Sequence, residues 1–209
     1  MRRKFEIIGL CIGWFAIVTQ FILMLQNRQT DIPEMLIRFF SFFTILTNIL
    51  VALYFTTVVF KLKQKPFKWL SSKGSITAIT TFILIVGLVY QVALRAVWQP
   101  TGLQQLVDEL LHTIIPIYML IYWFFKVEEN DLQFKPLFRW LLYPLLFIVI
   151  ILARGHASGY YPYPFLNVTE IGYNQALLNI GIILATCVMM LLGLRLIGQL
   201  IIKKQSNNP

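Results

Sequence analysis

The chain has few charged side chains and few residues that commonly hold metals or form disulfides. Charged residues make up 13% of its 209 positions, and only 2 histidines and 2 cysteines occur. Both cysteines, Cys11 and Cys187, fall within apolar runs, so the sequence predicts neither a disulfide framework nor a zinc site. We therefore expect no metal and no other cofactor.

Hydrophobic residues, in contrast, are abundant, at 58% of the chain with a mean hydropathy of +0.72, far above the values of soluble domains. Helices are predicted for all long apolar runs, because backbone groups have no water to bond in the bilayer. Six runs can cross a bilayer core of about 30 Å, at residues 7–26, 36–60, 76–96, 106–125, 137–153 and 176–200. The predicted fold is an all-α, polytopic membrane bundle of six transmembrane helices, with 1–209 as one domain.

Lys and Arg are unevenly distributed over the predicted loops. Only Arg28, Arg38, Arg95 and Arg154 fall on one side, and all other basic residues fall on the side that carries both termini. Short loops rich in Lys and Arg remain cytoplasmic, so both termini are predicted to be cytoplasmic in a multi-pass protein of the cell membrane. The net charge of +9 then reflects topology and contact with membrane lipids, not a nucleic-acid partner. The sequence leaves the oligomeric state open.

Polar side chains form stripes on two of the predicted helices. At 100° per residue, Thr44 and Asn48 share a face of the second run, and Thr77, Thr80 and Thr81 share a face of the third. Such residues commonly hydrogen-bond between transmembrane helices, and we favour that interpretation for the third run. For Thr44 and Asn48 a functional role stays open.

His112 lies within the fourth apolar run, where a titratable ring is costly and indicates function. At 1.5 Å per residue it lies roughly 9 Å below the outer start of its run, and Thr44 lies roughly 12 Å below the start of the second. Asp108, four residues earlier, shares a helix face with His112 and is predicted to orient its ring. Either Asp108 or Glu109 is also expected to pair with Arg95. The polar groups thus converge on a pocket near the outer surface.

Two further features flank this pocket. Pro116 removes a backbone hydrogen bond and predicts a kink just below His112. The last outer connection, residues 154–175, is rich in Tyr and Pro and is either a lid or an interfacial aromatic belt. His156 in this connection is expected to be exposed, which disfavours a haem with two histidine ligands.

Three segments carry a resemblance to known families: 42–48 (FFTILTN), 111–116 (LHTIIP) and 161–168 (YPYPFLNV). With them the chain resembles a bacterial family of predicted six-transmembrane proteins over nearly its whole length. It is also distantly similar to the eukaryotic androgen-induced and androgen-dependent membrane proteins, which hydrolyse fatty acid esters of hydroxy fatty acids with an intramembrane Thr and a His. The similarity implies Thr44 as nucleophile and His112 as base.

The implied function is hydrolysis of a membrane lipid ester by acyl transfer. Asp108 would orient His112, and Asn48 is predicted to donate to the oxyanion. One alternative is a small-molecule or proton-coupled transporter that uses Arg38 and the other outer charges as a relay. The nearly apolar inner half and the lack of an internal sequence repeat disfavour it. A structural membrane protein without ligand chemistry is the third hypothesis.

Overall fold

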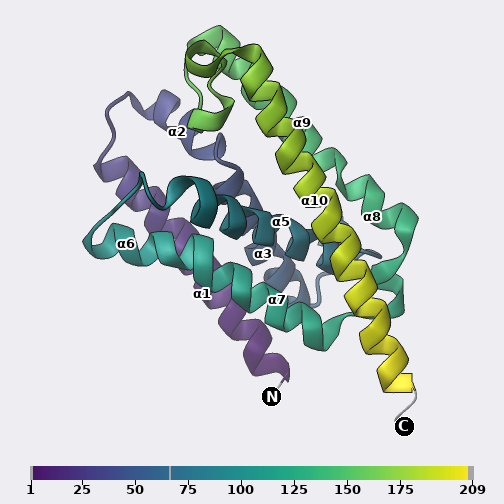
Figure 1. Cartoon of the computed structure of the whole chain (residues 1–209). Helices are drawn as coiled ribbons and strands as arrows, with labels where there is room; N and C mark the ends of the chain where they lie inside the picture. Colours follow the sequence, from purple (N-terminus) through teal and green to yellow (C-terminus); the bar gives the residue numbers. More distant parts are fainter. Residues whose placement is uncertain (1, 66, 207–209) are drawn as a thin grey trace.

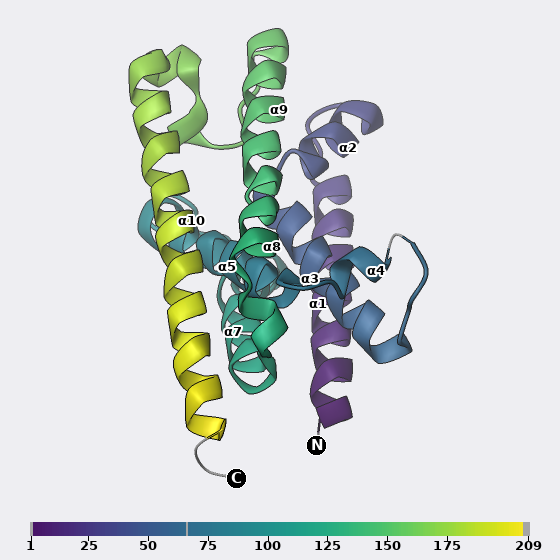
Figure 2. The same ribbon diagram turned by 90° about the vertical axis from the view of Figure 1, so that its right-hand side faces the viewer.

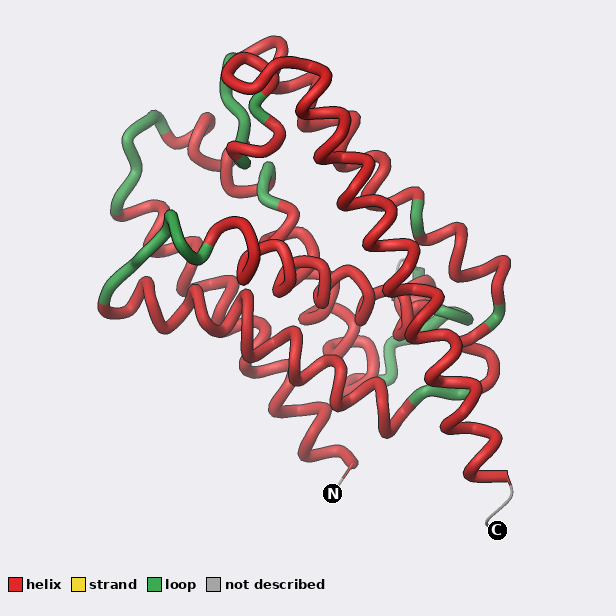
Figure 3. Tube along the Cα trace, in the orientation of Figure 1, coloured by secondary structure: helices red, strands yellow, loops and turns green. Residues whose placement is uncertain are grey.

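The computed structural model describes residues 2–65 and 67–206, and within these residues the chain is helical with no β-strand (Figure 3). Six helical segments are long and apolar enough to cross a membrane, so the protein is an all-α, six-span membrane bundle. Three spans are single helices: α1 (Arg2–Gln26), α3 (Phe43–Phe60) and α10 (Val168–Ser206). The third span in chain order combines α5 (Ser75–Val89) with the π-helical turn η1 (Tyr90–Leu94), and the fourth combines α6 (Gly102–Glu109), the π-helical turn η2 (Leu110–Ile114) and α7 (Ile115–Lys126). The fifth combines α8 (Phe134–Trp140) and α9 (Leu142–Ser158). Shorter elements fill the connections: α2 (Ile32–Phe40), α4 (Phe67–Leu70) and the 3-10 turns η3 (Glu129–Leu132) and η4 (Pro164–Leu166).

Both chain termini lie at the same end of the bundle, as an even number of crossings requires (Figures 1 and 2). Helix α2 and the connection between α9 and α10 lie at the opposite end. We call this second end the outer end, after the charge distribution that predicts it to face outward.

Helix α5 forms the centre of the bundle. Of its span, 67% is buried, against 22% for α1 and for α10. Helices α3, α7 and α10 pack against it, and α1 packs along α3 on the far side. A helix that is apolar all round suits such a central position. Helices α1, α9 and α10 at the periphery of the bundle instead expose apolar side chains, as faces turned to lipid do.

One of the three threonines of α5, Thr77, connects two helices inside the core, as the sequence predicted, whereas Thr80 and Thr81 bond within their own helix. Thr77, Thr80 and Thr81 are all fully buried. The indole Nε1 of Trp123 on α7 donates to Thr77 Oγ1 over 2.9 Å, and Thr80 and Thr81 donate to carbonyls one turn earlier. These residues stabilise helix packing and take no part in a pocket.

The predicted helix over 36–60 is wrong, because the chain breaks at Ser41 and Phe42 into α2 and α3. The Ser41 hydroxyl donates to the Ile37 carbonyl over 2.6 Å and closes α2. Phe42 is extended, with φ −89° and ψ 122°, and its ring packs edge-on against Tyr163 at 5.9 Å. Thr44 therefore lies in the first turn of a helix and not eight residues inside one.

The fifth and sixth spans also differ from their predicted limits of 137–153 and 176–200. The fifth extends from Phe134 to Ser158 with a break at Leu141. Pro144 accounts for the break, since it has no N–H for the carbonyl four residues earlier and its ring clashes with that carbonyl. The sixth span begins at Val168 and bends at Gly172, whose φ of 76° suits glycine.

Candidate active site

The structure brings Thr44 and His112 together at the outer end of the bundle. Thr44 Oγ1 on α3 lies 3.4 Å from His112 Nε2 on η2. This separation is long for a hydrogen bond, but catalytic hydrogen bonds often shorten only when substrate is bound. Thr44 is 9% exposed and the His112 side chain 12% exposed, so both are shielded yet open to a small molecule. The predicted meeting of these two side chains is thus present.

Two π-helical turns position the His112 ring. One, η2, contains His112 itself, and the other, η1, begins with Tyr90. The Tyr90 and His112 rings stack with centroids 4.1 Å apart and planes 15° from parallel. Single π-helical turns are common at functional sites because the extra residue redirects side chains. Pro116, where a kink was predicted, lies directly after the η2 turn, at the start of α7.

A close helix crossing holds the backbone of His112. A Cβ on Gly87 of α5 would lie 2.9 Å from the His112 carbonyl oxygen and 3.3 Å from the Pro116 ring. Only glycine therefore lets α5 approach this turn so closely. The ring of His112 is fixed from one side by Tyr90 and its backbone from below by α5.

Asp108 orients His112 and sets its tautomer. His112 Nδ1 lies 2.9 Å from the Asp108 backbone carbonyl oxygen and 3.4 Å from the Asp108 carboxylate oxygen Oδ1. Both are acceptors, so Nδ1 carries the proton and Nε2 is left to accept a proton from Thr44. Trp98 Nε1 donates to the same carboxylate oxygen over 3.2 Å and helps to hold it in place.

Glu109, and not Asp108, pairs with Arg95. Arg95 Nη2 lies 2.5 Å from Glu109 Oε1, and Thr113 donates to the other Glu109 oxygen over 2.7 Å. Gln91 joins this group by donating to Thr113 over 3.0 Å. The two neighbouring acids therefore have separate tasks, and Asp108 is left for His112.

Asn48 supports the backbone around the pair. It is fully buried, and its amide nitrogen donates to the Thr44 carbonyl over 2.8 Å and to the Leu111 carbonyl over 3.3 Å. Both amide hydrogens are occupied in this arrangement, so they are not available to an oxyanion. Asn48 instead ties α3 to the turn that carries His112. Its predicted oxyanion role has no support in these contacts.

Other donors surround Thr44. Its own backbone N–H lies 3.4 Å from the Tyr163 hydroxyl, which accepts this contact. Phe42 offers no side-chain cap, and the first N–H groups of a helix carry partial positive charge. Burial raises the pKa of the Tyr163 phenol above its usual range, so the hydroxyl keeps its proton and can donate it. The sequence placed Tyr163 in a connection that is either a lid or an aromatic belt and gave it no catalytic role, because no local pattern links it to α3.

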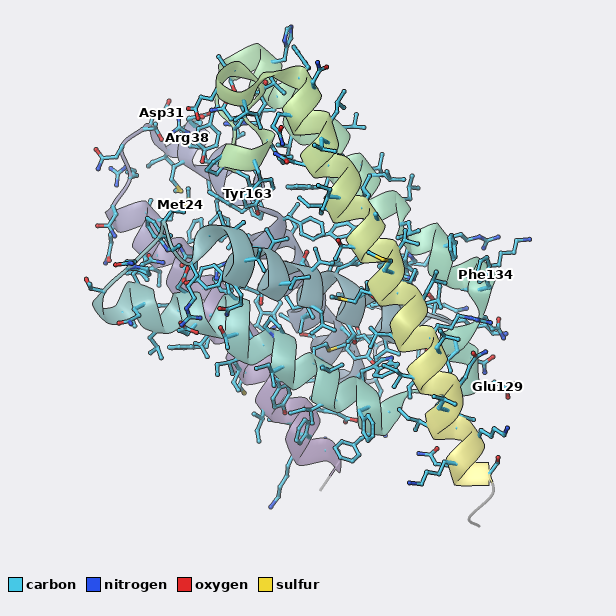
Figure 4. The ribbon with its side chains drawn as sticks, viewed as in Figure 1. Met24, Asp31, Arg38, Glu129, Phe134 and Tyr163 are labelled. Atoms are coloured by element: carbon cyan, nitrogen blue, oxygen red, sulfur yellow. The ribbon has the colours of Figure 1, made fainter. Side chains whose placement is uncertain are left out.

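Two cavities meet at this site. The larger, which we call the outer cavity, has a volume of about 550 Å³ and is lined by polar groups that include Arg38, Asp108 and His112. Figure 4 shows Met24, Arg38 and Tyr163, which line it, together at the outer end, whereas Glu129 and Phe134 lie at the opposite end. The smaller, which we call the crevice, has a volume of about 70 Å³ and lies between α5, α9 and α10.

The connection from α9 to α10 covers the outer cavity. Tyr160 and Tyr163 both line it. The Arg38 guanidinium lies 4.1 Å from the centre of the Tyr160 ring and that of Arg154 lies 4.8 Å from it. Glu34 bridges the two arginines, with Oε1 2.7 Å from Arg38 Nε and 2.8 Å from Arg154 Nη2. We call these four residues, Glu34, Arg38, Arg154 and Tyr160, the outer clamp.

His156 is exposed at the outer end of α9 and does not reach the site. Across residues 2–65 and 67–206, no group of three or more His, Cys, Asp and Glu side chains is placed to hold a metal ion. No protein-family model, curated protein or solved structure matches this chain. The functional argument therefore rests on the geometry around Thr44 and His112.

Proposed function

We propose that this membrane protein is an intramembrane lipid-ester hydrolase with Thr44 as nucleophile and His112 as general base. The observation that carries the proposal is the alignment of three groups. Thr44 Oγ1 faces His112 Nε2 at 3.4 Å, and Asp108 accepts at His112 Nδ1. A nucleophile, a base with its acceptor nitrogen turned to it, and an orienting acid form the usual arrangement for acyl transfer.

The reaction has two steps. In the first, His112 Nε2 takes the Thr44 proton while Oγ1 attacks the ester carbonyl, and the same proton then passes to the departing alcohol. In the second, water gives a proton to His112 and attacks the acyl-Thr44 ester. The acid leaves and the proton returns to Thr44 Oγ1. The outer cavity, which contacts both side chains, supplies the water.

The developing oxyanion is stabilised at the start of α3. The Tyr163 hydroxyl lies next to the nucleophile and keeps a proton to donate, and the helix N-terminus adds its positive partial charge. The Thr44 N–H joins it as a donor only when it leaves its 3.4 Å contact with that hydroxyl. Donors that are fixed before reaction are worth most in a site with little water. Tyr163 therefore takes the place first assigned to Asn48.

The transporter hypothesis has less support. A carrier needs a polar path that continues toward the inner end, whereas the core below Asn48 is closed by Val51, Phe55 and Phe82, each at most 1% exposed. The polar lining of the outer cavity ends at the Thr44 and His112 level. This closure favours chemistry at the outer end over passage through the bundle.

Turnover of a panel of lipid esters by the purified protein tests the proposal. The panel includes fatty acid esters of hydroxy fatty acids, following the resemblance of the sequence. We expect hydrolysis by the wild-type protein and its loss in Thr44→Ala and His112→Ala. Thr47→Ala is the matched control, because Thr47 is also buried on α3 but contacts the Tyr143 hydroxyl over 2.9 Å.

A serine-hydrolase-type covalent probe gives a second readout. We expect it to label Thr44 and to need His112. Labelling of Thr47, or equal turnover in all three variants, would show that the proposed nucleophile is wrong. An inactive wild-type protein across the whole panel would refute the hydrolase.

A further inference from the structure

Thr44 lies in the wall between the outer cavity and the crevice. Three residues line both spaces: Thr44, Leu94 and Tyr163. When the carbonyl of an ester lies at Thr44, its acyl part therefore lies on one side of this wall and its alcohol part on the other. The two sides differ in chemistry, which decides the direction in which an ester binds.

The outer cavity contains the proton-transfer groups. His112 and Asp108 line it, and neither lines the crevice. The alcohol that leaves after attack must receive its proton from His112, and the water of the second step must give its proton to the same ring. The leaving alcohol and the attacking water therefore both occupy the outer cavity. The acyl part, which stays on Thr44, is left on the other side.

The crevice has the lining that a hydrocarbon chain requires. Apart from Thr44, Tyr163 and the Cys187 thiol, every side chain that lines it is hydrocarbon. An apolar cavity of this kind stays free of water and accepts apolar guests. Ile180 and Cys187 are seven residues apart on α10, so this wall of the crevice extends roughly 10 Å into the hydrocarbon region.

We propose that the crevice between α5, α9 and α10 is the acyl-chain site: it binds the part of the alkyl chain next to the ester carbonyl, since about 70 Å³ holds only a few methylene groups, while the polar alcohol part occupies the outer cavity. This inference rests on the proposed hydrolase function. The substrate class is then an ester of an unbranched acyl chain with a polar alcohol. The chain enters sideways from the membrane between α9 and α10, which stand apart from each other in Figure 2 and both expose apolar side chains such as Leu146 and Leu178.

The crevice selects by shape and not by hydrophobic attraction. A chain that moves from lipid into an apolar crevice exchanges one hydrocarbon environment for another, so each methylene adds little binding energy. A side chain that fills the inner half of the crevice instead excludes long chains by overlap. Cys187 is 2% exposed and lies at this inner part, which makes it the position to fill.

The test compares Cys187→Trp with Met189→Trp, two residues further along α10 and 64% exposed. Two ester series are used in lipid nanodiscs, one with a fixed polar alcohol and lengthening acyl chains, the other with a fixed acyl chain and varied alcohols. For Cys187→Trp we expect kcat/KM to fall roughly tenfold or more on long acyl chains only. Met189→Trp should keep the wild-type profile. An equal loss on all chain lengths, or a loss that follows the alcohol series, overturns the proposal.

A binding readout does not depend on turnover. A fatty acid with a terminal diazirine is photo-crosslinked to the full-length protein in phosphatidylcholine vesicles. We expect cross-links within 144–148 and 180–187, lost in Cys187→Trp and kept in Met189→Trp. Cross-links confined to the lipid-facing surface around Met189, or unchanged in both variants, overturn the acyl-chain site. If Cys187→Trp does not elute as a folded protein, Ile148→Phe fills the crevice from α9 instead.

The two readouts separate the inference from the function on which it rests. Cross-links in the crevice without any turnover refute the hydrolase and leave a lipid-chain site. Turnover that needs Thr44, with a chain-length profile unchanged by Cys187→Trp, refutes the acyl-chain site and leaves the hydrolase.

Discussion

The substitution Asp108→Asn measures what the carboxylate contributes to the His112 imidazolium. Asn retains the shape of the side chain and an oxygen that accepts from Trp98, but it removes the negative charge 3.4 Å from His112 Nδ1. A pair of unit charges at this distance interacts by about 5 kcal/mol at an effective dielectric constant of about 20. Because the outer cavity admits water beside the pair, only part of this interaction is retained.

The Asp108 backbone carbonyl limits the loss. It lies 2.9 Å from His112 Nδ1 and is unchanged by the substitution, so the tautomer stays correct. We therefore expect kcat to fall about 10²-fold, or about 2.7 kcal/mol, and not by the roughly 10⁴-fold seen in triads that also lose the tautomer.

The assay is the release of alcohol from an ester in the first turnover, measured against pH. Glu109→Gln is the matched control, since Glu109 is the adjacent acid but contacts Arg95 and Thr113 instead of His112. We expect the control to retain its rate. Full activity in Asp108→Asn, or an equal loss in Glu109→Gln, would refute the orienting role of Asp108.

Two further predictions concern the connection between α9 and α10. Tyr163→Phe should lower kcat about 10²-fold with KM nearly unchanged, because it removes one oxyanion donor and leaves the Thr44 N–H; first-turnover kinetics measure this. The outer clamp should loosen in acid: the hydrogen bond from Arg38 holds the pKa of Glu34 below its ordinary 4.5, so the clamp is intact above that value and is lost as the pH falls through the lowered pKa. Amide hydrogen exchange of residues 159–167, corrected for the intrinsic rate, should then rise in acid, and Glu34→Gln should remove this dependence.

Different outcomes would contradict these two predictions. Tyr161→Phe is the control for the first, because its ring rests on Gly155 and does not reach Thr44; equal losses in both variants would indicate a packing effect. For the second, an exchange profile with the same acid dependence in Glu34→Gln would show that another group loosens the connection.

Periodicity and position predicted much of the site. The spacing of Asp108 and His112 puts them on one helix face whatever the rest of the fold. The meeting of Thr44 with His112 was also predicted, but from a depth counted along a continuous helix that the break at Ser41 and Phe42 interrupts. Six apolar runs likewise require six spans in a bilayer. These conclusions depend on local chain geometry, which a sequence displays directly.

Contacts between distant segments were not predictable. The break at Ser41 and Phe42 has neither Pro nor Gly, and its reason is the packing of Phe42 against Tyr163, 121 positions further along the chain by residue number. The same contact brings the Tyr163 hydroxyl to the Thr44 N–H. The contacts of Asn48 were not predictable for a related reason, since its second acceptor is the Leu111 carbonyl of another helix.

The two π-helical turns constrain how this sequence can change in length. Each such turn contains one residue more than an α-helical turn, and removal of one residue rotates everything beyond it by about 100°. A deletion within 110–114 would restore a regular helix but would turn Asp108 away from the partners of α7. A deletion within 90–94 would likewise move Arg95 away from Glu109. The number of residues in these turns must therefore stay constant for the site to form. Substitutions there are tolerated far better than insertions or deletions.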